Sequence, residues 1–120
     1  MNNILDVPGW LKSTDYTGAV GLTVKCYVKP DKVWEYKDLI RERLQVILTK
    51  PGLLCFKLNS DYESDNILWL VEEWESPAAL LTHLSTQWYQ DQFLVRSEPL
   101  LQQVSQRALY KINTLQQITI

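Results

Sequence analysis

Apolar and polar residues alternate along several short stretches of the chain. Every second position from Val20 to Val28 is apolar, and the positions between them include Thr23, Lys25 and Tyr27. A period of two is typical of a β-strand with one buried face. Similar short apolar runs bounded by turn residues predict four strands in all, at residues 19–28, 53–59, 67–74 and 108–112.

Two segments between these strands have a helical period instead. After Pro30 and Asp31, apolar residues recur every three or four positions as far as Ile47, and Lys50-Pro51-Gly52 ends the pattern. Ser76-Pro77 predicts the start of a second helical region, because a Ser hydroxyl can cap free N–H groups and Pro suits the first helical position. This region continues through residues 87–96. The solvent side of the first helix is predicted to carry Lys37, Arg41, Glu42 and Arg43.

The order β-α-β-β-α-β with short connections predicts an α+β fold of the ferredoxin-like kind. In that fold a four-stranded antiparallel sheet carries both helices on one face. Residues 1–18 mix Pro, Gly and polar groups and are predicted to form an extended N-terminal arm. The domain itself is predicted over residues 19–112, followed by a C-terminal extension over 113–120.

The third strand is apolar on both of its faces. Leu70 and Trp74 share one face, whereas Trp69 and Val71 share the other. Two helices can cover only one side of the sheet, and an antiparallel sheet with a solvated face should carry polar residues there. The simplest cover is the same face of a second copy, so we expect a homodimer formed through the sheet.

Composition limits the possible partners. A net charge of −2 without a Lys/Arg cluster argues against nucleic acid, and no apolar run approaches the roughly 18–20 residues that span a bilayer. The N-terminal residues do not resemble a secretory signal, and Cys26 and Cys55 lack a CxxC companion. We therefore expect a cytoplasmic protein with reduced cysteines. With one His and scattered carboxylates, no metal site is expected.

Motifs in the second half of the chain resemble a known family. They are Pro51-Gly52-Leu53-Leu54, the run from Leu70 through Glu72-Glu73-Trp74-Glu75 to Ser76, the run Ala78 to Leu84, and Trp88-Tyr89. From about Val20 to Ile112 the chain resembles the antibiotic biosynthesis monooxygenases, which are small dimeric α/β-barrel proteins. Some members oxidise quinols or aromatic polyketides without metal or flavin, so the resemblance implies no cofactor. Others degrade haem, process small signalling molecules or have no assigned reaction.

The resemblance also argues against two branches of that family. The haem-degrading branch places Asn, Trp and His where this chain has approximately Val24, His83 and Phe93, so the iron ligand is missing. Branches that act on small oxygenated signals often carry a second His five residues after the first, where this chain has Trp88.

His83 is the candidate catalytic residue. It is the only histidine, and as a neutral imidazole it can accept a proton from a phenolic or enolic substrate. The alternative is a helix residue whose ring tips into the core and bonds a carbonyl. The candidate substrate-binding residues are aromatic and able to stack on a flat ligand, the alternative being core and dimer-interface packing. They are Trp69, Trp74, Trp88, Tyr89 and Phe93.

A carboxylate cluster at the end of the third strand is a weaker candidate. It comprises Glu72, Glu73 and Glu75, of which an inward-pointing Glu73 would act as an acid or base. Three functions remain open: a cofactor-free monooxygenase acting on a quinol or anthrone, a non-catalytic protein that binds a small apolar or aromatic ligand, and a purely structural dimer. The substrate of such an oxygenase must supply the electrons for O₂.

Overall fold

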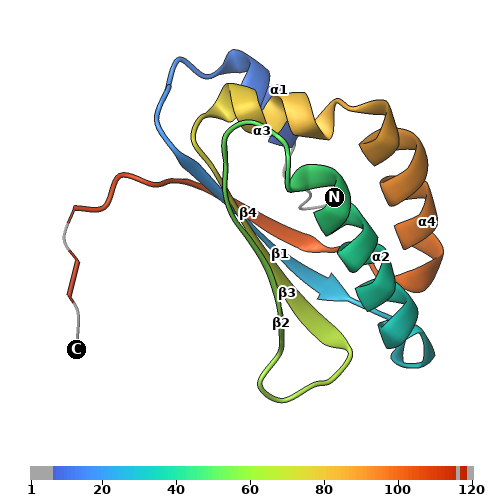
Figure 1. Ribbon diagram of the computed structural model, residues 1–120. Coiled ribbons are helices and arrows are strands. Elements are labelled where there is room, and N and C mark those ends of the chain that lie inside the picture. The colour runs from blue at the N-terminus through green and yellow to red at the C-terminus, as the bar shows by residue number, and fades with distance from the viewer. Residues whose placement is uncertain (1–6, 116, 119–120) are drawn as a thin grey trace.

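A computed structural model describes residues 7–115 and 117–118. Its four strands form one antiparallel sheet in the order β2-β3-β1-β4 (Figure 1). The strands are β1 (Val20–Tyr27), β2 (Leu53–Ser60), β3 (Ile67–Trp74) and β4 (Gln106–Lys111). The helical segments are α1 (Val7–Ser13), η1 (Pro30–Lys32), α2 (Val33–Ile47), α3 (Pro77–Leu84), the π-helix η2 (Tyr89–Leu94), α4 (Val95–Ser97) and η3 (Glu98–Leu100). The ferredoxin-like α+β prediction is confirmed.

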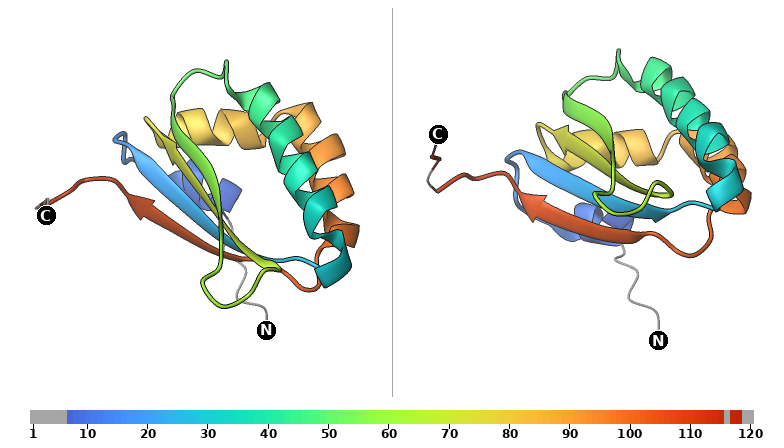
Figure 2. Two further views of the ribbon diagram at one scale, coloured as in Figure 1. Left: turned by 60° about the horizontal axis from the view of Figure 1, so that its bottom comes forward. Right: turned by 90° about the horizontal axis from the view of Figure 1, so that it is seen from below.

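The core lies between the sheet and the helices on one side of it. Alternate residues of β1 and β3 are buried, from Val20 to Val28 and from Leu68 to Trp74. Figures 1 and 2 show α2 and α4 side by side over this face of the sheet. The opposite face carries the other parity, including Trp69 and Val71, and is only half-buried.

Local sequence explains where the second helical region begins. Ser76 has an extended backbone, and its side-chain oxygen accepts a hydrogen bond from the Ala79 N–H at 3.1 Å. Pro77 then occupies the first helical position, where its missing N–H removes no helix hydrogen bond. The predicted start of α3 is therefore confirmed.

Two local predictions are wrong, and one strand is irregular. Residues 7–13 form α1 rather than part of an extended arm, and Val7 and Leu11 are buried in the core; residues 1–6 of that predicted arm lie outside the described part. A bulge between Leu53 and Cys55 interrupts the pairing of β2 with β3, and Leu54 within it is 57% exposed. Arg43, predicted on the solvent side of α2, is 1% exposed.

Candidate functional site

Three polar side chains from three different elements meet inside the core. Arg43 comes from α2, Glu72 from β3 and His83 from α3, and each is at most 2% exposed. Arg43 follows Tyr36 by seven residues and precedes Ile47 by four, so it lies on the core-facing stripe of its helix. Glu72 shares the inner parity of its strand with the buried residues Leu68, Leu70 and Trp74.

Hydrogen bonds connect the three groups in a fixed arrangement. Arg43 Nη2 donates to Glu72 Oε2 at 2.9 Å, and the same nitrogen lies 3.0 Å from His83 Nε2. Because a guanidinium only donates, His83 Nε2 must accept, which assigns the imidazole proton to Nδ1. Trp74 Nε1 donates to the other oxygen of Glu72 at 3.2 Å. The carboxylate is thus held at both oxygens.

Two donors of this cluster have nothing to donate to. Arg43 Nε and His83 Nδ1 are buried and lack a hydrogen-bond partner within the described part of the chain. Buried polar groups are nearly always paired with protein or with ordered water, so these two donors are available to a water molecule or to a ligand. Such a molecule would have to supply acceptor atoms, such as phenolate, carbonyl or carboxylate oxygens.

His83 is neutral in this environment. Burial, followed by the positive charges of Arg43 and Lys50, lowers its pKa from 6.5 to about 3. Its lone pair at Nε2 faces Arg43, so the ring can accept a substrate proton only if the guanidinium moves. The general-base role of His83 remains a prediction.

Aromatic rings surround the Arg43 guanidinium. Its Cζ lies 4.6 Å from the ring centroid of Phe93, 5.0 Å from that of Tyr89 and 5.1 Å from that of Phe56. These distances fit cation–π attraction in a site from which water is largely excluded. Tyr89 and Phe93 both lie on the π-helix η2, a rare geometry that is frequent at functional sites.

Most of the predicted site residues gather around this cluster. Trp74 stacks on His83 with ring centroids 5.1 Å apart, Tyr89 stacks on Phe93 at 5.5 Å, and Trp88 stacks on Phe93 at 6.3 Å. Trp69 is the exception, because it lies on the outer face of the sheet. There its Nε1 donates to Asp61 at 2.9 Å, and the Lys25 ammonium lies over its ring.

The carboxylates of β3 are arranged differently from the prediction. Glu72 points inward and is buried, whereas Glu73 lies on the outer parity and is half-buried. The inward orientation on which an acid or base role of Glu73 depended is therefore not present. Arg43 was missed as a member of the site and Glu72 was named only within the weaker carboxylate cluster, although each is a charged residue on the apolar side of its element.

Two spaces adjoin the cluster. A small cavity of about 40 Å³ is lined in part by Arg43, Glu72, Tyr89, Phe93 and Arg107. A separate open groove of about 380 Å³ has a lining that includes Lys50, Trp74, Thr82, His83 and Thr86. The first can hold a molecule of about the size of water, and the second has the volume of a small-ligand site.

The described residues contain no group of three or more His, Cys, Asp or Glu side chains placed to hold a metal ion. Among the helices that the structure describes, none is long and apolar enough to cross a membrane.

The fold and the site together define a class of protein. It is a ferredoxin-like α+β domain that has a buried charged cluster, a small cavity and an open groove. Sequence comparison is more specific, since the profile described as Antibiotic biosynthesis monooxygenase matches residues 19–93, more than half of the chain. The chain belongs to this family.

Solved structures agree on the fold. A conserved protein from Methanosarcina mazei Go1 is 25% identical with a TM-score of 0.73, over 79% of this chain and 93% of that one. A structure from Caulobacter crescentus CB15 is 18% identical with a TM-score of 0.75, over 82% of this chain and 93% of that one. A structure from Nitrosomonas europaea is 16% identical with a TM-score of 0.75, over 85% of this chain and 97% of that one. At these identities the likeness shows the fold alone. Comparison with curated proteins gives no match.

Proposed function

We propose that this protein is a cofactor-independent monooxygenase that oxidises a small electron-rich aromatic, of the quinol or anthrone type, with O₂. The observation that carries the proposal is the buried Arg43–Glu72–His83 cluster, with two unpaired donors and a wall of aromatic rings. Membership of the monooxygenase family supports the same reaction class.

The reaction balances without any other redox partner. An anthrone-type CH₂ group plus O₂ gives a ketone and water, so that one oxygen atom enters the product and the other takes both hydrogens. A hydroquinone plus O₂ gives a hydroxyquinone and water in the same way. In both cases the substrate anion donates the electrons, so the protein must favour the anion, hold it and exclude water.

The charges around the small cavity favour an anionic substrate. Arg43 and Arg107 contribute two positive charges to its lining and Glu72 one negative charge, while His83 beside it is neutral. A phenolate or enolate oxygen can pair with the free Arg43 Nε–H. A cavity that holds benzene is about 150 Å³, so an aromatic substrate needs more room than the present cavity of about 40 Å³ provides, and its lining has to move.

Oxygen consumption with a panel of hydroquinones and anthrones tests the proposal. Wild type should exceed the uncatalysed rate, and His83→Ala should lower the uptake at least tenfold if His83 accepts the proton or orients Arg43. Ser85→Ala, an exposed residue at the end of α3 that lines neither space, is the matched control and should retain the rate. Uptake that His83→Ala leaves unchanged would remove His83 from the mechanism, and no uptake over the panel would refute the oxygenase.

A second candidate function is binding without catalysis. It is favoured by the difference between the two spaces, because the 380 Å³ groove beside Trp74 and His83 can hold a ligand that the 40 Å³ cavity cannot. Calorimetric titration with the non-oxidisable analogue 2-naphthol separates the two. Binding together with the absence of oxygen uptake would favour the binding protein.

We also propose that the outer face of the sheet forms a homodimer interface. Ile67, Trp69 and Val71 are half-buried there, and Tyr110 is 42% exposed. Covering them with a second copy would contribute roughly 25 cal/mol per Å² of apolar surface. Sedimentation of wild type should give a dimer that Val71→Glu converts to a monomer, whereas Val104→Glu in an exposed loop should leave the dimer intact. A wild-type monomer would refute this interface.

A further inference from the structure

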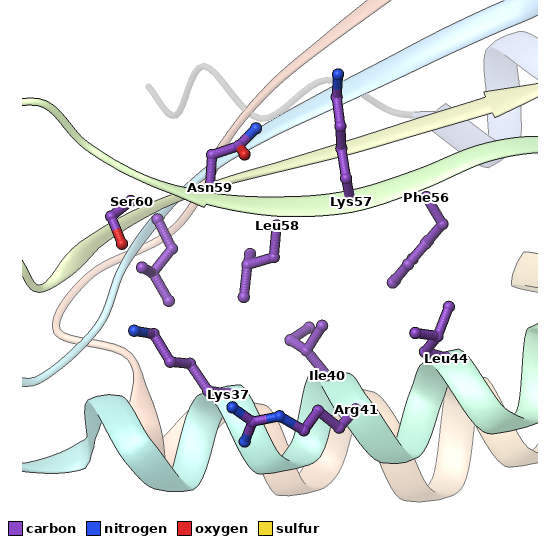
Figure 3. A pocket seen from close by; sticks show the side chains of 10 residues that line it. Lys37, Ile40, Arg41, Leu44, Phe56, Lys57, Leu58, Asn59 and Ser60 are labelled. Carbon is purple, nitrogen blue, oxygen red and sulfur yellow. The ribbon is translucent and has the colours of Figure 1, made fainter.

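A second groove, whose lining does not include His83, runs between α2 and the edge strand β2. Figure 3 shows Ile40 and Leu44 of the helix facing Phe56 and Leu58 of the strand across it. Its volume is about 330 Å³, at the lower end of the range for small-ligand sites. With Leu68 behind them, these side chains give the groove an apolar floor.

The rim of the groove is positively charged. Lys37, Arg41 and Lys57 are among its lining residues, and no Asp or Glu is. Arg41 already pairs with Asp38 at 2.6 Å, and the Lys37 ammonium lies 5.0 Å from the Trp34 ring centroid with no carboxylate partner among residues 7–115 and 117–118. In Figure 3 the Lys57 side chain points away from the gap, so Lys37 and Arg41 are the cations nearest to a ligand that lies in it.

An apolar floor with a cationic rim is complementary to one kind of molecule. The floor favours a hydrocarbon chain or ring, and the rim favours a negatively charged head group at the mouth. A narrow gap between one helix and one strand fits a single chain and not the flat surface of a bilayer. We propose that this groove binds a single-chain amphipathic carboxylate, such as a fatty acid of medium length, independently of the oxidation proposed above.

Phe56 links the groove to the charged cluster, although the groove and the cluster are separate sites. The same ring lines the groove and lies 5.1 Å from the Arg43 guanidinium carbon. A ligand in the groove therefore contacts one wall of the Arg43 environment, while His83, Trp74 and Tyr89 are absent from the lining of the groove.

Calorimetric titration of the full chain with decanoate, decyltrimethylammonium and decanol tests the proposal, because the three probes share a tail and differ in the head group. Decanoate should bind at least tenfold more tightly than either of the others. The double variant Lys37→Glu/Arg41→Glu should weaken decanoate binding at least tenfold, whereas Lys12→Glu/Lys29→Glu, with the same change in charge at exposed positions elsewhere, should leave it within twofold.

A second variant tests the floor. Leu44→Trp fills the groove from a half-buried position, and it should abolish decanoate binding while the circular dichroism spectrum stays that of wild type. Equal binding of the cationic probe, an unaffected Lys37/Arg41 variant, or co-sedimentation with phosphatidylglycerol vesicles in place of free decanoate binding would each overturn the proposal. The test measures binding and not oxygen uptake, so the fatty-acid site can be refuted without affecting the proposed oxygenase, and the reverse also holds.

Discussion

The single histidine makes the stability of this protein depend on pH in a way that one variant can isolate. The folded-state pKa of His83 is about 3, against 6.5 for an unperturbed imidazole. Below pH 6.5 the unfolded chain therefore binds a proton that the folded chain does not bind until about pH 3. The contribution of neutral His83 is complete above pH 6.5 and is lost as the pH falls toward 3.

The magnitude follows from the two pKa values. At pH 5 the imidazole is almost fully protonated in the unfolded chain and neutral in the folded one. The interval that counts is therefore the one from the unfolded pKa of 6.5 down to pH 5, about 1.5 pKa units. At about 1.36 kcal/mol per unit, the free energy of unfolding should fall by about 2 kcal/mol between pH 7.5 and pH 5 because of this residue alone. His83→Gln removes the titrating group, so its free energy of unfolding should lack this part of the decrease.

Urea denaturation of both proteins at pH 7.5, 6.5, 5.5 and 5 provides the measurement. Subtracting the variant's pH dependence from that of wild type removes the carboxylates, which titrate in both. The chain has one histidine, so its imidazole NMR signal can be followed independently and should show no titration above pH 5. Parallel stability curves for the two proteins, or an NMR midpoint near 6.5, would refute the reasoning that burial and Arg43 keep the ring neutral.

Three further predictions concern stability, each measured by urea denaturation. Glu72→Gln leaves the Arg43 cation buried without its counter-charge and should lower the free energy of unfolding by about 3–5 kcal/mol. The double variant Arg43→Met/Glu72→Leu should lower it by less than Glu72→Gln alone, and an equal or greater decrease would contradict a buried ion pair. Gly52→Ala should cost about 1–3 kcal/mol, because φ is +86° and the new Cβ would lie 2.7 Å from Ala79 Cβ; an unchanged midpoint would argue against that turn. Ser76→Ala should cost about 1 kcal/mol by removing the N-cap of α3, and Ser76→Asp should retain the stability.

Periodicity predicted the fold well because the elements themselves are regular. The run from Val20 to Val28 alternates without interruption, and its apolar parity is the buried one. The opposite orientation of Trp69 and Trp74 also follows from strand parity alone. Residues 7–13 were harder to predict, because Pro8 and Gly9 are typical of loops and the burial of Val7 and Leu11 depends on tertiary packing.

The charged cluster could not be predicted by the rule that charged helix residues face solvent. Arg43 lies on the apolar stripe of α2, but only the presence of Glu72 on β3 and of His83 on α3 makes its burial favourable. Those partners are 29 and 40 residues away in sequence. A charged residue at an apolar position on each of two elements is the signal that would have linked them.

The π-helix makes the aromatic wall sensitive to chain length. Trp88 and Phe93 stack although they are five residues apart, which in an α-helix would separate their directions by about 140°. The wider turn brings both rings to the same side. Deleting one exposed residue within it, such as Gln90, would leave Trp88 and Phe93 four positions apart, about 40° apart in an α-helix, so these two rings would stay on one side. Tyr89 would then precede Phe93 by three residues instead of four, about 60° to the other side of Phe93. A shift in length by one residue can therefore change how the rings of this wall face one another while every side chain that forms it is retained.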